Sequence, residues 1–262
     1  IAYAQQYDLL LKGGTVIDPK NGLNAPRDVA ILAGRIAAVE ANIPAARAKK
    51  VLDVAGLTVT PGLIDIHAHL FHASGVPDAW AGDQSVQPDA FSFRTGCTTM
   101  VDAGSAGWRN FEQFRTMVID RVKTRVLSFI NIAGFGMISD ATEQGDFNPQ
   151  AVAKLVAKHK DIVVGVKTAH YQKPDWDSVD NALEAGHLAN VPIMVDFGFF
   201  LPSRPYYRLV GEKMRPGDIS THCFRGPVPW LDENGKLYDY IRKARQRGIV
   251  FDVGHGGGSF VF

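Results

Sequence analysis

The 262-residue chain contains only two cysteines, Cys97 and Cys223, which allow one disulfide at most and exclude a disulfide framework. Its formal net charge is only +1, which gives no electrostatic case for binding nucleic acid or an anionic membrane surface. No apolar run approaches the roughly 20 residues that a bilayer-spanning helix needs. We therefore expect the partner to be a small-molecule substrate, and we expect neither nucleic acid nor a membrane as a partner. Assembly into a homo-oligomer is left open.

What is present is the composition of a globular protein, 46% hydrophobic and 21% charged, with enough material for a large core. The chain begins at Ile1 rather than Met, and Ala2-Tyr3-Ala4 fits the A-x-A end of a secretory signal peptide. We therefore expect a signal-peptide remnant over residues 1–4 and export to the periplasm. The alternative is a cytoplasmic protein whose given sequence starts at Ile1 for a reason unrelated to export.

Residues 7 to 60 contain short apolar segments joined by glycine-containing pairs, at Gly13-Gly14, Ala33-Gly34 and Ala55-Gly56. Strand pairs joined in this way predict β-hairpins. We expect a small β-sandwich-like domain over residues 1–60, ahead of a turn at Pro61-Gly62.

After residue 61, short apolar strands alternate with polar, helix-like stretches. Repeated βα units of this kind predict a metal-binding TIM-type (β/α)8 barrel over residues 61–262. An open doubly wound sheet is the alternative, but no Gly-rich phosphate loop follows the first strand. Only seven strands fit before Phe262, so we expect the barrel to lack its eighth strand and to be incomplete at its C-terminal end. The expected strands are 63–69, 98–103, 125–132, 162–168, 192–197, 218–223 and 249–255, and helices are expected from Asn148-Pro149, over 178–188 and over 237–247.

Polar residues close each expected strand, at the edge where barrel enzymes place their chemistry. On the first strand, Asp65, His67 and His69 point the same way, because side chains alternate with period two. Unpaired polar groups on a buried strand are costly, so the two imidazoles predict a metal ion. A hydrogen-bonded pair of core histidines is the alternative. The strand-end residues are His69, Asp102, Asn131, Lys167, Asp196, His222 and His255.

These residues carry a resemblance to a known family. The run Pro61-Gly62-Leu63-Ile64-Asp65-Ile66-His67-Ala68-His69 resembles the first-strand signature of the amidohydrolase superfamily. Gly96 to Gly104 resembles its second strand, and Asp252 to Phe260 resembles the seventh strand of its dihydroorotase-like and deacetylase-like branch. Lys167 and His222 occupy the positions of its strand-four lysine and strand-six histidine.

The resemblance implies a metal centre held by His67, His69, Lys167 and His222. The lysine would be a carbamate derived from CO2 and would bridge one or two divalent ions, most often zinc, with manganese or iron as alternatives. The implied activity is hydrolysis of an amide, cyclic amide or ester by a metal-activated hydroxide, as in deacetylases of N-acyl amino acids or dihydroorotases. From the residues alone, a salt-bridged Lys167 and a hydrogen-bonded His222 remain open.

Two departures from the family pattern stand out. Asp196 lies where the family has a strand-five histidine, which makes it a doubtful ligand. The aspartate that serves the family as general base, on the eighth strand, has no counterpart in this chain. Asp102 is a candidate base by chemistry only. A non-catalytic barrel homologue that acts as a binding or assembly module is therefore the alternative function.

Four further residues complete the expectations. His255 is a candidate for catalysis, substrate binding or support of a metal ligand. His170 and Arg225 follow the fourth and sixth strands and are candidates for substrate binding, Arg225 through a bidentate contact with a carboxylate. His159 lies in a lysine-rich helical stretch and is expected to be solvated.

Overall fold

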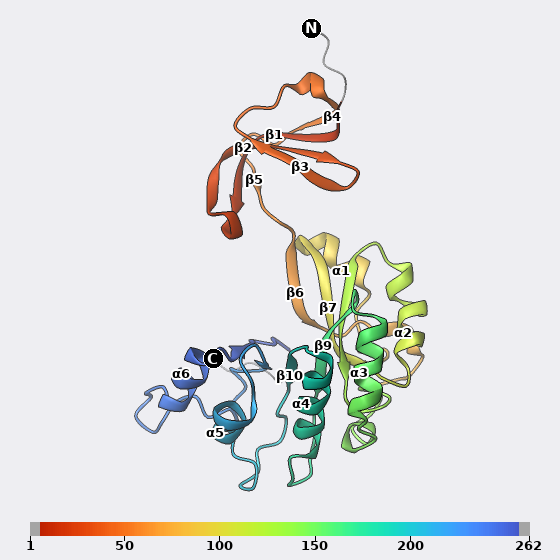
Figure 1. Ribbon diagram of the computed structural model, residues 1–262, viewed down its shortest axis with the longest axis vertical. Coiled ribbons are helices and arrows are strands. Elements are labelled where there is room, and N and C mark those ends of the chain that lie inside the picture. The colour runs from red at the N-terminus through yellow and green to blue at the C-terminus, as the bar shows by residue number, and fades with distance from the viewer. Residues whose placement is uncertain (1–5, 257–262) are drawn as a thin grey trace. The chain divides into compact units, whose positions relative to one another are not determined.

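The computed structural model describes residues 6–256, so the expected signal-peptide remnant lies outside the described residues. The chain divides into two compact units, Ile1–Gly62 and Leu63–Phe262, which meet at the expected Pro61-Gly62 junction (Figure 1). Between residues 6 and 256, no helix combines the length and apolar character that a bilayer crossing requires.

The first unit is a five-stranded sheet built around its longest strand, β1. The strand order is β3-β2-β1-β4, and β5 also pairs with β1. The pairs β1–β2 and β2–β3 are antiparallel, whereas β4 and β5 run parallel to β1. The strands are β1 (Tyr7–Asp18), β2 (Leu23–Leu32), β3 (Arg35–Glu40), β4 (Ala48–Asp53) and β5 (Thr58–Val59), with 3-10 turns at η1 (Pro19–Asn21) and η2 (Ala45–Arg47).

One of the three expected hairpins forms and two do not. Ala33-Gly34 joins β2 to β3 as predicted. Gly13-Gly14 is instead a bulge inside the continuous strand β1, where the register shifts between Leu11 and Gly14. Gly13 has φ +83°, and its N–H donates to the buried carboxylate of Asp28 at 2.8 Å. The prediction at Ala55-Gly56 was also wrong, because β4 and β5 each pair with β1 and not with each other.

Asp28 anchors this bulge, and its replacement should destabilise the first unit. Its carboxylate accepts hydrogen bonds from Gly13 N, Ile43 N and Lys12 Nζ, each at 2.8 Å. Burial opposes ionisation, but these donors outweigh it and lower the pKa of Asp28. Asp28→Asn would place the NH₂ group of an amide next to these N–H donors. The substitution should therefore lower the free energy of unfolding by about 2–3 kcal/mol at pH 7.

The difference in unfolding free energy between Asp28→Asn and wild type should become smaller as the pH falls. The folded-state pKa lies below the unfolded value of about 3.8, so the carboxylate stabilises above that pH and the benefit is lost as the pH falls through the folded pKa. Hydrogen exchange of residues 7–59 in urea, at pH 7 and pH 3, measures this. Glu40→Gln, at an exposed carboxylate, is the matched control. Equal stability of Asp28→Asn and wild type at pH 7 would contradict the assignment.

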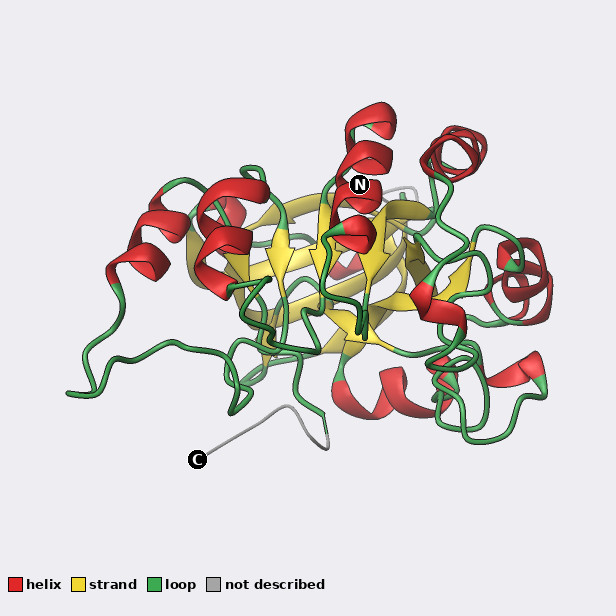
Figure 2. Cartoon of the chain, turned by 90° about the horizontal axis from the view of Figure 1, so that it is seen from below, coloured by secondary structure: helices red, strands yellow, loops and turns green. Residues whose placement is uncertain are grey.

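The second unit is a curled parallel sheet of seven strands, in the order β12-β11-β10-β9-β8-β7-β6. Helices lie outside the sheet (Figure 2). All seven expected strands form, and the βα barrel architecture is confirmed as a partial barrel. The strands are β6 (Leu63–Ala68), β7 (Cys97–Gly107), β8 (Arg125–Asn131), β9 (Val163–Thr168), β10 (Ile193–Val195), β11 (Ile219–Ser220) and β12 (Val250–Phe251).

The three expected helices form, and α3 begins where the sequence predicts. The side chain of Asn148 caps α3 by accepting from Ala151 N at 2.9 Å, and Pro149 occupies the first turn. The α-helices are α1 (Pro88–Thr95), α2 (Phe111–Met117), α3 (Pro149–Lys158), α4 (Asp177–Ala189), α5 (Tyr206–Arg208) and α6 (Asp239–Gln246); η3 (His72–Ser74), η4 (Ile119–Arg121) and η5 (Thr142–Gln144) are 3-10 turns, and η6 (Leu209–Lys213) is a π-helix.

The expectation that the first barrel strand is fully buried was wrong. Strand β6 pairs with β7 alone and is an edge of the described sheet. Three of its apolar side chains, Leu63, Ile64 and Ile66, are exposed by 56%, 62% and 37%. The alternation itself holds, since Asp65 and His67 line the same cavity.

Candidate metal centre

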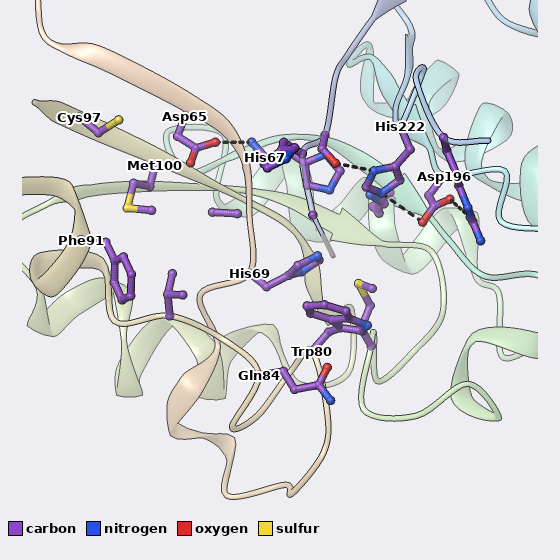
Figure 3. Close-up of a pocket in the computed structure, with 18 of the residues that line it drawn as sticks. Asp65, His67, His69, Trp80, Gln84, Phe91, Cys97, Met100, Asp196 and His222 are labelled. Atoms are coloured by element: carbon purple, nitrogen blue, oxygen red, sulfur yellow. Dashed lines mark hydrogen bonds and ion pairs between the residues drawn. The ribbon is translucent and has the colours of Figure 1, made fainter. Parts of the chain in front are cut away.

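One cavity of about 570 Å³ gathers the strand-end residues of the second unit (Figure 3). It lies where β6, β9, β10, β11 and β12 finish, because parallel strands bring their carboxyl ends to one edge of a sheet. Of the residues predicted from the sequence, the cavity brings together His67, His69, Lys167, His170, Asp196, His222, Arg225 and His255, and it leaves out Asp102.

The histidines share an arrangement that suits metal ligands. His67 Nδ1 lies 2.8 Å from Asp252 Oδ2, and His222 Nδ1 donates to the carbonyl of Gly254 at 2.7 Å. His69 Nδ1 lies 3.0 Å from Ser105 Oγ. Because Nδ1 of each ring faces an acceptor, the proton of the neutral imidazole stays on Nδ1. The lone pair of Nε2 then remains available to a metal ion. Metal-binding histidines are oriented by such outer partners.

One of these partners, Asp252, is itself held by a further hydrogen bond. Asp252, directly after β12, also accepts from Thr221 Oγ1 at 2.6 Å. Burial would raise the pKa of Asp252, but the hydrogen bonds from His67 and Thr221 lower it to about 2. A carboxylate that stays ionised at neutral pH is a firm acceptor for an imidazole N–H. Asp252 thus orients His67.

Burial also sets the protonation of the first-strand histidines. Desolvation, with the neighbouring charge of Lys167, lowers the pKa of His67 to about 4. The same two causes hold the pKa of His69 well below its ordinary value. Both rings are therefore neutral at pH 7, which is the form that binds a metal ion.

Lys167 is 1% exposed, and the contact formed by its Nζ is with Met194 Sδ at 3.6 Å. Burial lowers the pKa of Lys167 and favours the uncharged amine. Gly104 makes room for this side chain. It has φ +90°, and a Cβ there would lie 2.5 Å from Lys167 Cγ. A salt bridge, the alternative for Lys167, does not form among the described residues.

Asp196 forms ionic contacts with three side chains. Its Oδ2 lies 3.2 Å from His170 Nε2 and 3.4 Å from His222 Nε2, and its Oδ1 lies 3.7 Å from Arg225 Nη1. Burial opposes ionisation of Asp196, but the two histidines outweigh it and keep its pKa well below the ordinary value. Gly198 N also donates to Oδ1 at 3.0 Å.

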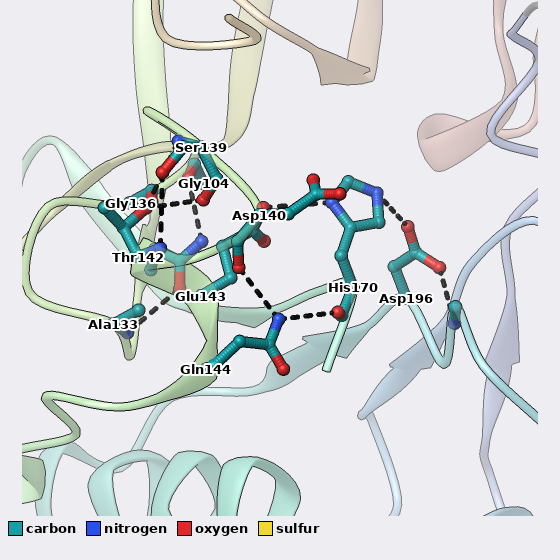
Figure 4. A network of polar contacts seen from close by, with 12 residues as sticks. Gly104, Ala133, Gly136, Ser139, Asp140, Thr142, Glu143, Gln144, His170 and Asp196 are labelled. Atoms are coloured by element: carbon teal, nitrogen blue, oxygen red, sulfur yellow. Dashed lines mark hydrogen bonds and ion pairs between the residues drawn. The ribbon is translucent and has the colours of Figure 1, made fainter. Parts of the chain in front are cut away.

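His170 lies between two carboxylates (Figure 4). Its Nδ1 is 3.0 Å from Glu143 Oε1, opposite the contact with Asp196. Burial would lower the pKa of His170, but the hydrogen bonds to Asp196 and Glu143 raise it to about 10. Across the described ranges, ligand atoms of Asp140, Glu143 and His170 lie within 4.8 Å of one another, a group that could hold a metal ion.

The position of Asp102 argues against its predicted role as general base. It is fully buried, and its oxygens accept from the backbone N–H groups of Leu70, Gly104 and Ser105 at 2.7 to 3.0 Å. Burial raises its pKa to about 6, against the hydrogen bonds, which include one from the Ser105 side chain. Asp102 therefore supports Ser105, the partner of His69, from behind the cavity.

The residues that sequence reasoning missed are the partners of the histidines. Asp252 follows its strand as His69 follows the first, so its place at a strand end was a usable signal. Glu143 lies in η5, between elements, and Ser105 and Thr221 are small polar residues. Nothing in the spacing of these three marks them.

Comparison with known proteins agrees with this geometry. No family model matches the chain. A curated deacetylase of Enterococcus faecalis is 30% identical over 265 residues, covering 98% of this chain and 68% of that protein. A crystal structure of an adenine deaminase matches with a TM-score of 0.85 at 29% identity, over 97% of this chain and 67% of that one. A dihydroorotase structure matches with a TM-score of 0.75 at 27% identity, over 96% and 67%.

The chain spans 56% and 59% of two further deacetylases, from Agrobacterium fabrum and Brucella anthropi, at 30% identity to each. The two matches cover 87% and 97% of this chain. The chain belongs to the amidohydrolase superfamily.

Proposed function

We propose that this chain carries the metal centre of a hydrolase that cleaves a carbon–nitrogen bond in an N-acyl amino acid or a cyclic amide, or a related ester bond. The observation that carries the proposal is the convergence of imidazoles, each held at Nδ1, and a buried lysine amine on one cavity. The names of the relatives support it, since they are deacetylases and dihydroorotases.

In this proposal, His67, His69, Lys167 and His222 hold one or two divalent ions. Zinc suits the nitrogen-rich donor set best, and manganese or iron are alternatives. Lys167 fits as a carbamate formed from its neutral amine and CO2, because an ammonium cannot be a ligand. Bound there, the metal supplies a Lewis acid that polarises a carbonyl oxygen and lowers the pKa of a coordinated water.

The remaining cavity residues act on the substrate. Arg225 has a side chain exposed by 29% and lines the cavity beside Asp196, so it can bind a substrate carboxylate through two N–H groups. His255 also lines the cavity, and we assign it to proton transfer at the leaving group. An amino-acid carboxylate at Arg225 directs the adjacent amide toward the histidines.

A hydrolysis screen tests the proposal. N-acetyl amino acids, hydantoins and aryl acetates should include at least one compound whose turnover stops with a chelator. The matched substrates are an N-acetyl amino acid and its C-terminal amide, which lacks the carboxylate. We expect the amide to have a kcat/KM about 10- to 100-fold lower, worth 1.4–2.7 kcal/mol.

The second candidate, a non-catalytic binding module, is favoured by Asp196 in the place of the family's histidine. A binding module predicts a different result in the hydrolysis screen. The purified protein would bind the acids without turning over any of the three classes. Turnover that is sensitive to the chelator excludes the module, and its absence across the screen with metal bound excludes the hydrolase.

A further inference from the structure

Trp80 is a large aromatic side chain that lines the cavity although its two neighbours in the chain are buried. Ala79 and Ala81 are exposed by 3% and 0%, whereas Trp80 is exposed by 41%. The centroid of its ring lies 5.1 Å from that of His69, and the two planes are tilted by 41° (Figure 3). The indole therefore lies beside a proposed metal ligand and keeps much of its surface open to a bound molecule.

The segment that carries Trp80 is held by backbone hydrogen bonds at two points. Val86 N donates to the carbonyl of His69 at 2.8 Å, so the segment returns to the end of β6. Ala81 N donates to the carbonyl of Met137 at 3.1 Å, which ties the segment to the loop after β8. Because these bonds fix the backbone on both sides of Trp80, a ligand that contacts the indole pays little entropy to order it.

Trp80 and Arg225 contact different parts of the proposed centre. Trp80 lies beside His69, which follows β6, whereas Arg225 Nη1 lies 3.7 Å from Oδ1 of Asp196, which follows β10. Strands β7, β8 and β9 separate β6 from β10 in the curled sheet. A substrate whose carboxylate is bound by Arg225 and whose amide lies at the proposed ligands therefore extends its acyl group toward Trp80.

We propose that Trp80 binds the acyl group of the substrate, and that the preferred acyl group is a planar aromatic one, as in an N-aroyl amino acid. The inference rests on the proposed function, because it names the acyl side of the same scissile amide. Aromatic pairs that stack with an offset or meet edge to face gain binding energy beyond the area that they bury. Covering the exposed indole also removes apolar surface from water, and the methyl group of an N-acetyl compound covers less of it.

Matched N-benzoyl and N-acetyl derivatives of one amino acid test the inference. Wild type should have a kcat/KM about 10-fold higher for the benzoyl compound, mainly through a lower KM. Trp80→Ala should remove this preference by lowering kcat/KM for the benzoyl compound about 10-fold, with a change of less than about 3-fold for the acetyl compound. Trp80→Phe, which keeps an aromatic ring, should retain most of the preference.

Phe93→Ala is the matched control, because it removes an aromatic side chain that is exposed by 61% on α1 and lies outside this cavity. Its kcat/KM for both compounds should equal that of wild type. Two results would overturn the inference. One is a wild type that does not prefer the benzoyl compound, and the other is a Trp80→Ala variant whose preference equals that of wild type.

A binding measurement separates this inference from the proposed function. N-benzenesulfonyl and N-methanesulfonyl derivatives of the same amino acid contain no amide carbonyl to hydrolyse, so calorimetry gives their Kd without turnover. If the screen finds no turnover, the proposed function fails. The aromatic subsite is then supported by a Kd about 10-fold lower for the benzenesulfonyl compound that Trp80→Ala raises, and it is overturned by equal Kd values. If the acetyl compound is hydrolysed and the benzoyl compound is not preferred, the inference alone fails.

Discussion

Lys167→Met should reduce turnover of the best substrate from the screen by at least about 1,000-fold, equivalent to about 4 kcal/mol of transition-state stabilisation. Methionine matches the length and apolar character of the buried stem but cannot form a carbamate. The fold should persist, since within residues 6–256 the hydrogen-bond contact of Lys167 Nζ is with Met194 Sδ alone. Metal per chain should fall with the activity, because the variant lacks a residue that would hold the metal in the proposed centre.

Two comparisons isolate the role of the amine. Lys160→Met, at an exposed lysine beyond α3, should have wild-type activity and metal content. Lys167→Ala leaves a space where a small carboxylate can enter, so millimolar acetate or propionate should restore part of its activity. A Lys167→Met variant with wild-type turnover and metal content would exclude Lys167 from the centre.

Removal of the metal should abolish activity and lower the stability of the second unit. Ions that bind only the folded state stabilise it by about 4 kcal/mol at 1,000 times their Kd. Dialysis against 1,10-phenanthroline should therefore lower the thermal midpoint as well as stop turnover. Adding Zn²⁺, Mn²⁺ or Fe²⁺ back should restore both and rank the metals.

The histidines of the first barrel strand provide the control for this experiment. His67→Ala removes a proposed ligand and leaves Asp252 with Thr221 as its partner. The variant should have the low thermal midpoint before dialysis, and chelator should lower it little further. A chelator effect of the same size in His67→Ala and wild type would show that the ion sits elsewhere.

The sequence predicted the barrel strands well because their signal is local. Each is a short apolar run closed by a polar residue, and parallel strands need little else to be recognised. The first unit was harder to predict. Gly13-Gly14 has the composition of a turn, and its hydrogen bond with the distant carboxylate of Asp28 in the bulge cannot be read from the local sequence.

The metal-binding candidates were predictable for the same reason, since His67, His69, Lys167 and His222 end strands. Their partners were not, because a hydrogen bond from His170 to Glu143 crosses 27 residues and one from His67 to Asp252 crosses 185. The surroundings of Asp102 could not be predicted, because the sequence does not distinguish a carboxylate that faces a cavity from one that accepts hydrogen bonds from backbone N–H groups.

His159 shows the same limit. Its lysine-rich surroundings predicted a solvated ring, but it is 4% exposed and lies 2.8 Å from Glu112 across α2 and α3. The lysines beside it, such as Lys154 and Lys160, are exposed, so the local composition was read correctly. The helix simply turns His159 toward Phe111, whose ring centroid is 5.1 Å away.

The position of β6 at an edge of the described sheet would couple metal binding at the proposed centre to the local order of this strand. The strand that carries His67 and leads to His69 pairs on one side only. Edge strands open with less free energy than central ones, so amide protons of β6 should exchange early. An ion bound by residues of β6 and by residues at the ends of β9 and β11 would link this strand to the opposite side of the cavity. Metal binding would then slow the hydrogen exchange of the β6 amides.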